Sequence, residues 1–516
     1  MLRAFSLPRR QLSIVAYCRL MSSASPTPNP QLHACFSPLP SYHGPAPDPP
    51  PAPKTLNPSS DATLPAPPTA KLRTGKLLQV LGVWFGIAAA IGNSIAAGII
   101  RTPGDIAKLL PNPWLFLAVW VLGGAYALLG ASSMAELAAA IPRSGGQYNF
   151  SRRAIGEYAG FIVGWSDWLS TAGTNAVVGI VIGEYSGALF TPLAGHEKLI
   201  AVVILLFFAA LQWGGVKRGK SAQLLTAVLK TAAFLILVLA CFVFGGPSHH
   251  AAAQEAANTS AFHGGWLLAV AIVLGMQSVI FTVDGWDGVI YFGEEVKDPG
   301  RDVPRAIFGS VVSIMGIYLL LNAALLYVLP MSKISGDIFP LGSAANAVFG
   351  RYGDVVIRSI MIVSMLSCIN ACQMFCTRIL YAMSVDGLFF QRASRVNKGG
   401  TPVIALLLST IVGIIFVLGS FERVIAMLSF FFVANYTLSY SSLFLLRKRE
   451  PHMPRPYRAW GYPYTTAAAL IASAIFLIGS LATDRENAPL ALVMLLLSYP
   501  IFRIMKKIAK PVAAAF

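Results

Sequence analysis

The chain has 516 residues, of which 55% are hydrophobic and only 12% are charged, and its mean hydropathy is +0.64. These values exclude an ordinary soluble globular domain, in which about 25% of residues are charged. The formal net charge of +17 would by itself suit an anionic partner such as nucleic acid. The distribution of the basic residues along the chain tests whether such a partner is indicated.

The first 76 residues differ in kind from the rest. Proline-rich stretches such as "SPLPSYHGPAPDPPPAPK" cannot bury a core, so residues 1–76 are predicted to be a disordered cytoplasmic tail. Residues 1–25 carry four arginines and no acid, which is typical of a mitochondrial targeting segment. A basic cytosolic tail, or a start of translation at Met21, would explain the same composition.

Apolar runs of about 20 residues follow, each long enough to cross a hydrocarbon core of roughly 30 Å. Segments in lipid must pair all of their backbone polar groups, and runs of this length favour helices over a closed barrel. The sequence therefore predicts an all-α membrane protein. Twelve transmembrane helices are expected at about 79–103, 113–141, 157–188, 198–214, 221–244, 266–294, 305–330, 353–384, 402–420, 423–446, 464–483 and 487–505.

Basic residues gather in alternate loops between these runs. The pattern matches the positive-inside rule and places both termini in the cytoplasm, so the net charge reflects topology and indicates no nucleic-acid partner. The basic loop residues are Arg143, Arg152, Arg153, Lys217, Arg218, Lys220, Lys297, Arg301, Arg305, Arg392, Arg395, Lys398, Arg447, Lys448, Arg449, Arg455 and Arg458.

Two of the predicted spans are interrupted. Small residues crowd the middle of the first span from Gly92 to Gly98, and the sixth span contains the run "DGWDG" at 284–288. Five spans separate the breaks, so they fall at corresponding positions of two five-span halves. Paired breaks of this kind indicate a transporter built from inverted repeats, although either break alone would fit an ordinary kink.

A helix that unwinds within the membrane frees backbone N–H and C=O groups, which must find partners. The N-terminus of the following half-helix suits a carboxylate, whereas freed carbonyls suit an ammonium group or another cation. An α-amino acid carries both groups on one carbon. The two breaks therefore predict a small substrate such as an amino acid or a related amine.

Four motifs make this prediction specific: "GNSIAAGIIRTPGDIA", "MAELAAAIPRSGGQYNFSRRAIGEYAGFIVGW", "EEVKDPGRDVPRAI" and "MPRPYRAWGYP". They resemble the amino acid–polyamine–organocation transporters, near the L-type amino acid transporter branch, over residues 77–480. The resemblance implies two inverted five-helix repeats of the LeuT type and alternating access. It divides the chain into a ten-helix transport core at 77–446 and two additional helices with a basic C-terminal tail at 447–516.

The resemblance also implies a substrate site at the two breaks. Phe281 aligns with an aromatic residue that closes over substrate, although a lipid-facing side chain is the alternative. Asp284 could hold a cationic side chain, accept a coupling proton or bind the free N–H groups after the break, and these roles stay open. The expected substrate-binding residues are Ile95, Ala96, Ala97, Gly98, Phe281, Thr282, Val283, Asp284 and Gly285. The first break reads Ala96-Ala97-Gly98, where the family usually has Gly-small-Gly.

Lys230 lies ten residues into the fifth predicted span. By resemblance it aligns with the lysine that replaces a bound sodium ion in sodium-independent members, so transport is predicted to be sodium-independent and coupled either to protons or to exchange. The alternative is a side chain that snorkels to the membrane surface.

Other polar residues receive weaker predictions. Cys368, Cys372 and Cys376 recur every fourth residue along one helix face, where packing is favoured over a soft-metal or redox site. We expect a helix cap from Asp287, caps or pairs with loop arginines from Glu136 and Asp167, pocket contacts from Thr171 and Asn435, and an inner gate or salt-bridge network from Glu294, Glu295 and Lys297.

The sequence contains no catalytic triad, nucleotide-binding glycine loop or metal-ligand cluster, so neither an enzyme nor a cofactor is expected. The expected partners are the substrate and membrane lipid. The predicted outer loop at 190–198 has no cysteine, so no disulfide-linked heavy subunit is expected. A nutrient sensor with the transporter fold, or a polyamine or organocation permease, is the alternative. The plasma membrane and vacuolar or other endomembranes are the favoured locations, with mitochondria less favoured.

Overall fold

The computed structural model describes residues 77–96, 98–245, 265–419, 421–483 and 488–508. The predicted tail at 1–76 and Ala97 of the first break lie outside these residues. Within them, the named elements are helices, accompanied by three isolated β-bridges. The prediction of an all-α fold is confirmed.

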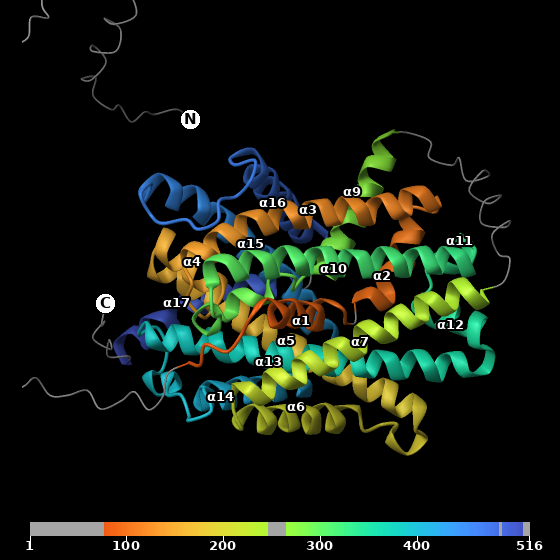
Figure 1. The fold of residues 1–516 in the computed structure, drawn as a ribbon, viewed down its shortest axis with the longest axis horizontal. Helices are drawn as coiled ribbons and strands as arrows, with labels where there is room; N and C mark the ends of the chain where they lie inside the picture. Colours follow the sequence, from red (N-terminus) through yellow and green to blue (C-terminus); the bar gives the residue numbers. More distant parts are fainter. Residues whose placement is uncertain (1–76, 97, 246–264, 420, 484–487, 509–516) are drawn as a thin grey trace, which may run out of the picture. The chain divides into compact units, whose positions relative to one another are not determined.

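Several of the long helices run in nearly the same direction across the view in Figure 1. Their bounds are α1 Val83–Ser94, α2 Gly98–Leu109, α3 Pro113–Ala140, α4 Gln147–Ala154, α5 Glu157–Leu189, α6 Glu197–Trp213, α7 Val216–Phe244, α9 Gly265–Val283, α10 Pro299–Val328, α11 Met331–Ile334, α12 Pro340–Phe349, α13 Gly353–Val385, α14 Val403–Leu418, α15 Phe421–Arg449, α16 Tyr464–Thr483 and α17 Ala488–Ile508. Short 3₁₀ helices lie at Thr191–Leu193, Gly288–Tyr291, Gly293–Glu295, Gly350–Tyr352 and Gln391–Ser394.

Two pairs of long helices make the most extensive contacts. Helix α5 packs along α13, and α3 packs along α10. The short helix α1 lies among α7, α10 and α13, and it also contacts the 3₁₀ turn at Gly288–Tyr291. The first break is therefore enclosed by long helices on several sides, which positions a site at the centre of this packing.

Polar side chains point inward and apolar ones outward on several helices, as α7 illustrates. Leu225, Val228 and Ile236 are more than half exposed, whereas Gln223 and Lys230 are fully buried. Lipid solvates apolar side chains and cannot pair polar groups, so this arrangement is the one expected of helices in a membrane.

Length and apolar composition identify four membrane-crossing candidates among the described residues: α3, α7, α10 and the stretch Pro340–Val385 that contains α12 and α13. The pair α1 and α2, bent by 56° at the break, adds a fifth. Shorter apolar helices lie at Leu267–Val283, Val403–Leu418 and Tyr464–Gly479. The chain is thus an integral membrane protein with several apolar helices, and the count of twelve spans stays a prediction.

The structure differs from the predicted spans in two places. The sixth span was expected to be helical on both sides of its break, but only the first part is an α-helix, and 3₁₀ turns follow it. Helix α10 starts six residues before its predicted limit, because Pro299 occupies a first-turn position, where proline needs no N–H partner. The short helices α4, α11 and α12 were not predicted.

Candidate functional site

The first break leaves backbone carbonyls without helical partners. Helix α1 ends at Ser94, and Ile95 has non-helical dihedrals of φ −80° and ψ 81°. The Ile95 carbonyl accepts hydrogen bonds from Ser364 Oγ and Lys230 Nζ, both at 2.6 Å. The Ser94 carbonyl accepts one from Tyr318 Oη at 2.8 Å. Side chains of three other helices therefore satisfy the unwound segment.

Lys230 supplies the positive charge at this break. Its side chain is fully buried, so it does not snorkel to the surface. Besides Ile95, the ammonium donates to the carbonyls of Ile91 at 3.3 Å and Gly92 at 2.9 Å. Three carbonyl oxygens around one ammonium resemble the oxygen shell of a bound cation. This geometry agrees with the expected contact, while the sodium-replacing role stays a prediction.

The second break lies directly against the first. Helix α9 ends at Val283, and Gly285 has φ +98°, a conformation that side chains disfavour. A Cβ at Gly285 would collide with the side chain of Asn93 in α1. Tyr318 Oη bridges the breaks, because it donates to the Thr282 carbonyl at 3.1 Å as well as to Ser94.

A second contact joins the segments that flank the breaks. Thr102 Oγ1 in α2 lies 2.6 Å from Thr282 Oγ1 in α9. A Cβ at Gly98 would come within 3.2 to 3.3 Å of Thr282 atoms, so the start of α2 packs closely on the end of α9. The structure thus brings together seven predicted site residues that belong to the described breaks: Ile95, Ala96, Gly98, Thr282, Val283, Asp284 and Gly285.

Phe281 is placed differently. Its side chain is 37% exposed in the described structure. It lies on the last turn of α9, one residue before Thr282. Neither the predicted gate nor its lipid-facing alternative is decided by this position.

A small polar cavity of about 20 Å³ adjoins the second break, which is room for one water molecule. Asp284, Asp287 and Tyr436 face it together with residues of α1, α5 and α13. The full lining is Asn93, Gln147, Thr171, Thr174, Asp284, Gly285, Asp287, Tyr291, Cys372, Phe375, Phe432 and Tyr436. A cavity this small excludes an amino acid, so the site in this conformation is closed.

Asp287 was expected to cap a helix, and this prediction is wrong. It precedes the 3₁₀ turn Gly288–Tyr291, but its carboxylate caps no backbone N–H there. Gln147 Nε2 instead donates to Asp287 Oδ2 at 3.2 Å, and Ser439 Oγ donates to Gln147 Oε1 at 3.0 Å. Asp287 is therefore buried among neutral partners from α4 and α15.

The expectation that Asp167 pairs with a loop arginine is also wrong. Tyr291 Oη donates to Asp167 Oδ1 at 3.0 Å, while Asp167 Oδ2 has no hydrogen-bond partner among the residues that the structure describes. Thr171 lines the cavity, as predicted, and donates to the Asp167 backbone carbonyl at 2.7 Å. Asn435 is absent from the lining and accepts a hydrogen bond from Ser166.

Sequence reasoning missed Gln147, Thr174, Tyr291 and Tyr436. Gln147 belongs to α4, which interrupts a stretch interpreted as a loop. Tyr291 follows Asp284 by seven residues, on the 3₁₀ helix after the second break. The available signal was a hydroxyl-bearing side chain close to a predicted break. Thr174 lies one turn after Thr171, and this spacing was the available signal.

The three cysteines of α13 are buried, and two of them, Cys368 and Cys372, pack against Asn93 at the first break, whereas Cys376 contacts Trp168 of α5. Cys372 Sγ lies 2.9 Å from Asn93 Oδ1, and Cys368 Sγ lies 3.5 Å from the Asn93 carbonyl oxygen. Among the described residues no group of three His, Cys, Asp or Glu side chains is arranged to hold a metal ion. Packing, the favoured interpretation, fits these contacts.

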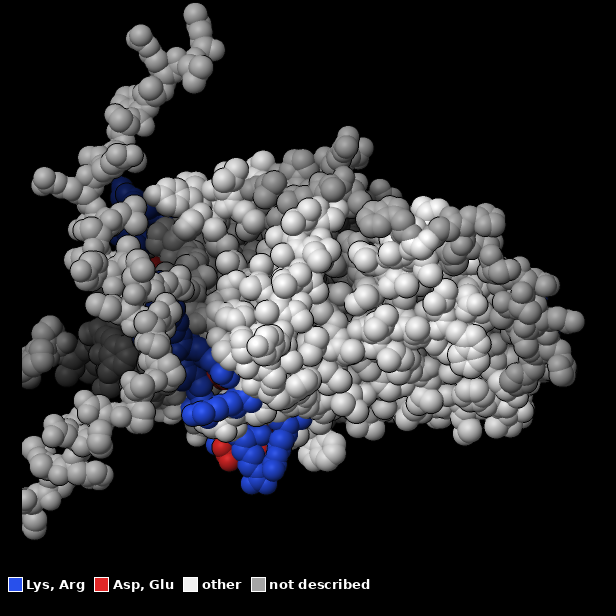
Figure 2. Space-filling view, turned by 90° about the horizontal axis from the view of Figure 1, so that it is seen from above, with Lys and Arg blue, Asp and Glu red and all other residues white. Residues whose placement is uncertain are grey.

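Basic side chains gather at one end of the face drawn in Figure 2, and most of the remaining surface there is uncharged. We call this region the basic end, and its loops and helix starts lie at 141–156, 214–220, 293–305, 386–402 and 447–463. Four carboxylates pair with arginines here: Glu136, Glu295, Asp386 and Glu450. Glu295 forms a buried bidentate pair with Arg378 of α13 at 2.9 and 3.1 Å, whereas no ion pair of Glu294 or Lys297 occurs among the described residues. The gate or salt-bridge network expected of these three residues stays a prediction.

Asp386 and Glu450 also pair with arginines at the basic end. Asp386 accepts from Arg143 at 2.9 Å and Arg152 at 3.1 Å. Arg153 binds both oxygens of Glu450, and this hydrogen bonding lowers the pKa of that carboxyl. These pairs join α4 to the segments that follow α13 and α15.

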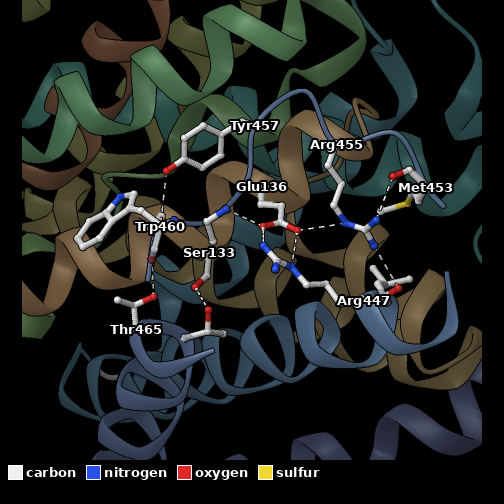
Figure 3. A network of polar contacts seen from close by, with 12 residues as sticks. Ser133, Glu136, Arg447, Met453, Arg455, Tyr457, Trp460 and Thr465 are labelled. Atoms are coloured by element: carbon white, nitrogen blue, oxygen red, sulfur yellow. Dashed lines mark hydrogen bonds and ion pairs between the residues drawn. The ribbon is translucent and has the colours of Figure 1, made fainter. Parts of the chain in front are cut away.

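Glu136 of α3 is the centre of a further network, drawn in Figure 3. Its carboxylate pairs with Arg447 at 2.5 Å and with Arg455 at 3.1 Å, which confirms the predicted pairing with loop arginines. It also accepts the Ala459 N–H at 2.6 Å. One carboxylate therefore fixes the 450–463 linker, which joins α15 to α16, onto α3.

Comparison with known proteins agrees with this architecture. The Amino acid permease family matches residues 81–498, which is more than half of the chain. The serine/threonine exchanger SteT of Bacillus subtilis is 30% identical over 448 residues, with 84% of this chain and 98% of the relative covered.

Mouse proteins show weaker similarity over similar lengths. The b(0,+)-type amino acid transporter 1 of Mus musculus is 26% identical, covering 80% of this chain and 84% of the relative. The Asc-type amino acid transporter 1 of the same species is 25% identical, covering 83% and 81%. The family and these relatives are permeases, exchangers and transporters rather than enzymes. The chain belongs to the amino acid permease family and is an integral membrane protein that transports amino acids.

Proposed function

We propose that the chain carries amino acids by alternating access, through twelve spans arranged as two inverted five-helix repeats and two additional helices. The observation that carries the proposal is the contact between two interrupted spans, where Tyr318 donates to carbonyls on both sides. Facing breaks supply backbone groups for a substrate at the centre of the membrane. The transport core would comprise 77–446, the additional helices 447–516, and the cytoplasmic tail 1–76.

The substrate carboxylate would bind the N-terminus of α2, and its ammonium group would bind carbonyls at the end of α9. The start of α2 presents free N–H groups and the positive end of the helix dipole at Gly98. Carbonyls of Phe281, Thr282 and Val283 lie at the last turn of α9, where helical partners run out. Ile95, Ala96 and Ala97 would complete the carboxylate side, and Gly285 allows the turn that places Asp284 in the cavity.

The substrate side chain would extend toward the acidic cavity. Its lining combines carboxylates with neutral donors, which suits small polar or cationic side chains. Because the cavity holds only about 20 Å³, admission of a substrate would require its lining side chains from α1, α5, α13, α15 and the second break to move apart. This acidity favours a cationic amine as the alternative substrate class, as in a polyamine or organocation permease.

Lys230 supports the proposal that transport is independent of sodium. Its ammonium already binds three carbonyls of the first break, which are oxygens that a bound cation would otherwise use. Proton coupling and exchange both remain compatible with a fixed cation at this position.

Uptake into proteoliposomes tests this function. Vesicles containing the full chain should accumulate labelled serine, threonine or arginine when preloaded with unlabelled substrate, or when an inward proton gradient is imposed. An imposed sodium gradient should not change the rate. Flux driven by sodium would contradict the role of Lys230, and the absence of any flux would favour the sensor.

Cysteine labelling tests the orientation. Ser335 follows α11 at the opposite end of α10 from the basic end. A cysteine introduced at Ser335 should react with an impermeant thiol reagent from outside only, and one introduced in the 386–401 loop from the cytoplasm only. Labelling of Ser335→Cys from the cytoplasm would overturn the topology.

A further inference from the structure

We infer that a groove at the start of α10 binds the phosphate headgroup of an anionic phospholipid, separately from the transport site. The groove has a volume of about 570 Å³, within the range of small-molecule sites. Its lining is Gly300, Arg301, Pro304, Arg305, Phe308, Pro456 and Tyr457. The first five come from one face of the first three turns of α10, and the last two from the 450–463 linker.

The charge of the groove is positive and not neutralised. Arg301 and Arg305 are exposed, and neither forms an ion pair in the described part of the chain. Asp302 follows Arg301 directly and Asp298 lies three residues before it, but within the described residues neither forms an ion pair with Arg301. By contrast, six arginines at the basic end bind carboxylates, at Glu136, Glu295, Asp386 and Glu450. Two guanidinium groups one helical turn apart can bind phosphate oxygens bidentately.

The remaining walls suit the glycerol and acyl part of a lipid. Phe308 and Tyr457 pack together with ring centroids 5.8 Å apart, and two prolines lie beside them. Helix α10 is one of the membrane-crossing candidates, so its first turns lie at the level where headgroups are found. The positive end of the helix dipole adds to the attraction for phosphate.

The linker side of the groove is held rigidly by the Glu136 network of Figure 3. Tyr457 Oη lies 3.3 Å from Ser132 Oγ in α3, and Ser132 Oγ also accepts the Trp460 N–H at 3.0 Å. A Cβ at Gly300 would lie 3.0 Å from Pro456 Cβ, so α10 and the linker meet closely. A bound headgroup would therefore bridge α10 to a segment fixed on α3.

Lipid is a better occupant than the chain's own N-terminal tail. Residues 1–76 contain eight lysines and arginines against two acids. Their net charge is positive, like that of the groove, so the two repel each other. The membrane presents anionic headgroups at high local concentration at the correct depth. We therefore assign the groove to a phospholipid phosphate.

The experiment compares lipid binding by three forms of the purified full chain. Phosphatidylglycerol is titrated into protein held in phosphatidylcholine nanodiscs, and bound lipid is counted by mass spectrometry alongside the thermal unfolding midpoint. The test variant is Arg301→Gln/Arg305→Gln. The matched control is Arg392→Gln/Arg395→Gln, which removes two exposed arginines of the same end that do not line the groove.

Phosphatidylglycerol should bind the native chain and the control equally, and the test variant at least about tenfold more weakly, since both phosphate contacts are lost. Equal binding by all three forms would overturn the inference. It would also fail if inorganic phosphate alone raised the unfolding midpoint as the lipid does, or if phosphatidylcholine bound as tightly as phosphatidylglycerol. If the double variant does not fold, Arg305→Gln alone should weaken binding in the same direction, and unchanged binding would contradict the site.

Discussion

At the basic end each of four carboxylates lies against an arginine, whereas the carboxylates of the central cavity lie against neutral donors. Glu295 represents the basic end, and Asp167, which binds the cavity-lining Tyr291, represents the centre; the two side chains are 0% and 2% exposed. Glu295 has a bidentate guanidinium partner, while Asp167 has one tyrosine hydroxyl and a free oxygen. A buried charge without a counter-charge is costly, so proteins retain one mainly where it serves a function. The paired acids hold helices together, and the unpaired acids are available to substrate or protons.

Near the two breaks, the buried lysine and the buried aspartates lie in separate places. Lys230 binds carbonyls of the first break, and no ion pair joins it to Asp284, Asp287 or Asp167 in the described residues. The first break therefore contains its own cation, whereas the acidic cavity beside the second break contains none. This difference predicts that positive charge enters the cavity from outside the protein.

The largest change in stability is expected when an ion pair at the basic end is broken. Arg378→Met leaves Glu295 buried without a partner, which should lower the free energy of unfolding by about 3–5 kcal/mol. Denaturant titration of the protein in detergent measures this free energy of unfolding. The double variant Arg378→Met/Glu295→Met should recover most of the loss, and Asp167→Asn should cost far less. A loss of similar size in Asp167→Asn would erase the contrast between the regions.

Removal of the central cation should abolish transport while the protein stays folded. Lys230→Met removes the three hydrogen bonds that hold the carbonyls of the first break, so uptake should fall by about 100-fold, which corresponds to about 2.7 kcal/mol. The matched control is Lys220→Met, on the same helix, whose ammonium donates to the Val80 carbonyl at 2.9 Å near the basic end. Equal loss of uptake in both variants would show that neither position is special.

A substitution at Asp284 should distinguish its three roles. If the carboxylate binds a cationic side chain, Asp284→Asn should weaken cationic amino acids by about 1–3 kcal/mol and spare neutral ones. If it binds backbone N–H groups, asparagine should largely work. If it carries a coupling proton, gradient-driven uptake should disappear while exchange persists.

Inhibition constants for a panel of amino acids, measured in both transport modes, separate these outcomes. Asp287→Asn is the control in the same cavity, because an amide oxygen can still accept from Gln147. Equal loss of every substrate and mode in folded Asp284→Asn protein would contradict all three roles.

The smallest effect is expected at an exposed pair of the basic end. Arg153 and Glu450 are 44% and 34% exposed, so Arg153→Gln should lower stability by at most about 1 kcal/mol at neutral pH. Because Arg153 lowers the pKa of Glu450, the contribution is complete above the unfolded-state pKa of about 4.3 and is lost as pH falls further. Unfolding curves of native and variant protein should therefore converge at low pH. A stability difference between native and variant protein that grows as the pH falls would contradict a stabilising ion pair between Arg153 and Glu450.

The sequence predicts the helical class and the positions of both breaks, because these depend on local composition and run length, whereas it left the burial of Lys230 open against snorkelling. Contacts between residues far apart in the sequence were harder to predict. Glu136 was assigned correctly because arginines are abundant in nearby loops, and the same reasoning failed for Asp167. Its partner Tyr291 lies 124 residues away, at the end of a short 3₁₀ helix. Likewise Asp287 meets Gln147 at a separation of 140 residues, on a short helix that hydropathy does not reveal.

The closed cavity has a consequence for thiol chemistry. Cys372 lines it and is 1% exposed, so an alkylating reagent larger than one water cannot reach the sulfur while the cavity has this volume. Alkylation of Cys372 can then proceed only during excursions to an open conformation. Its rate, corrected with a Cys372→Ser protein, would measure how often the empty transporter opens, and a bound amino acid would alter that frequency without any flux being followed.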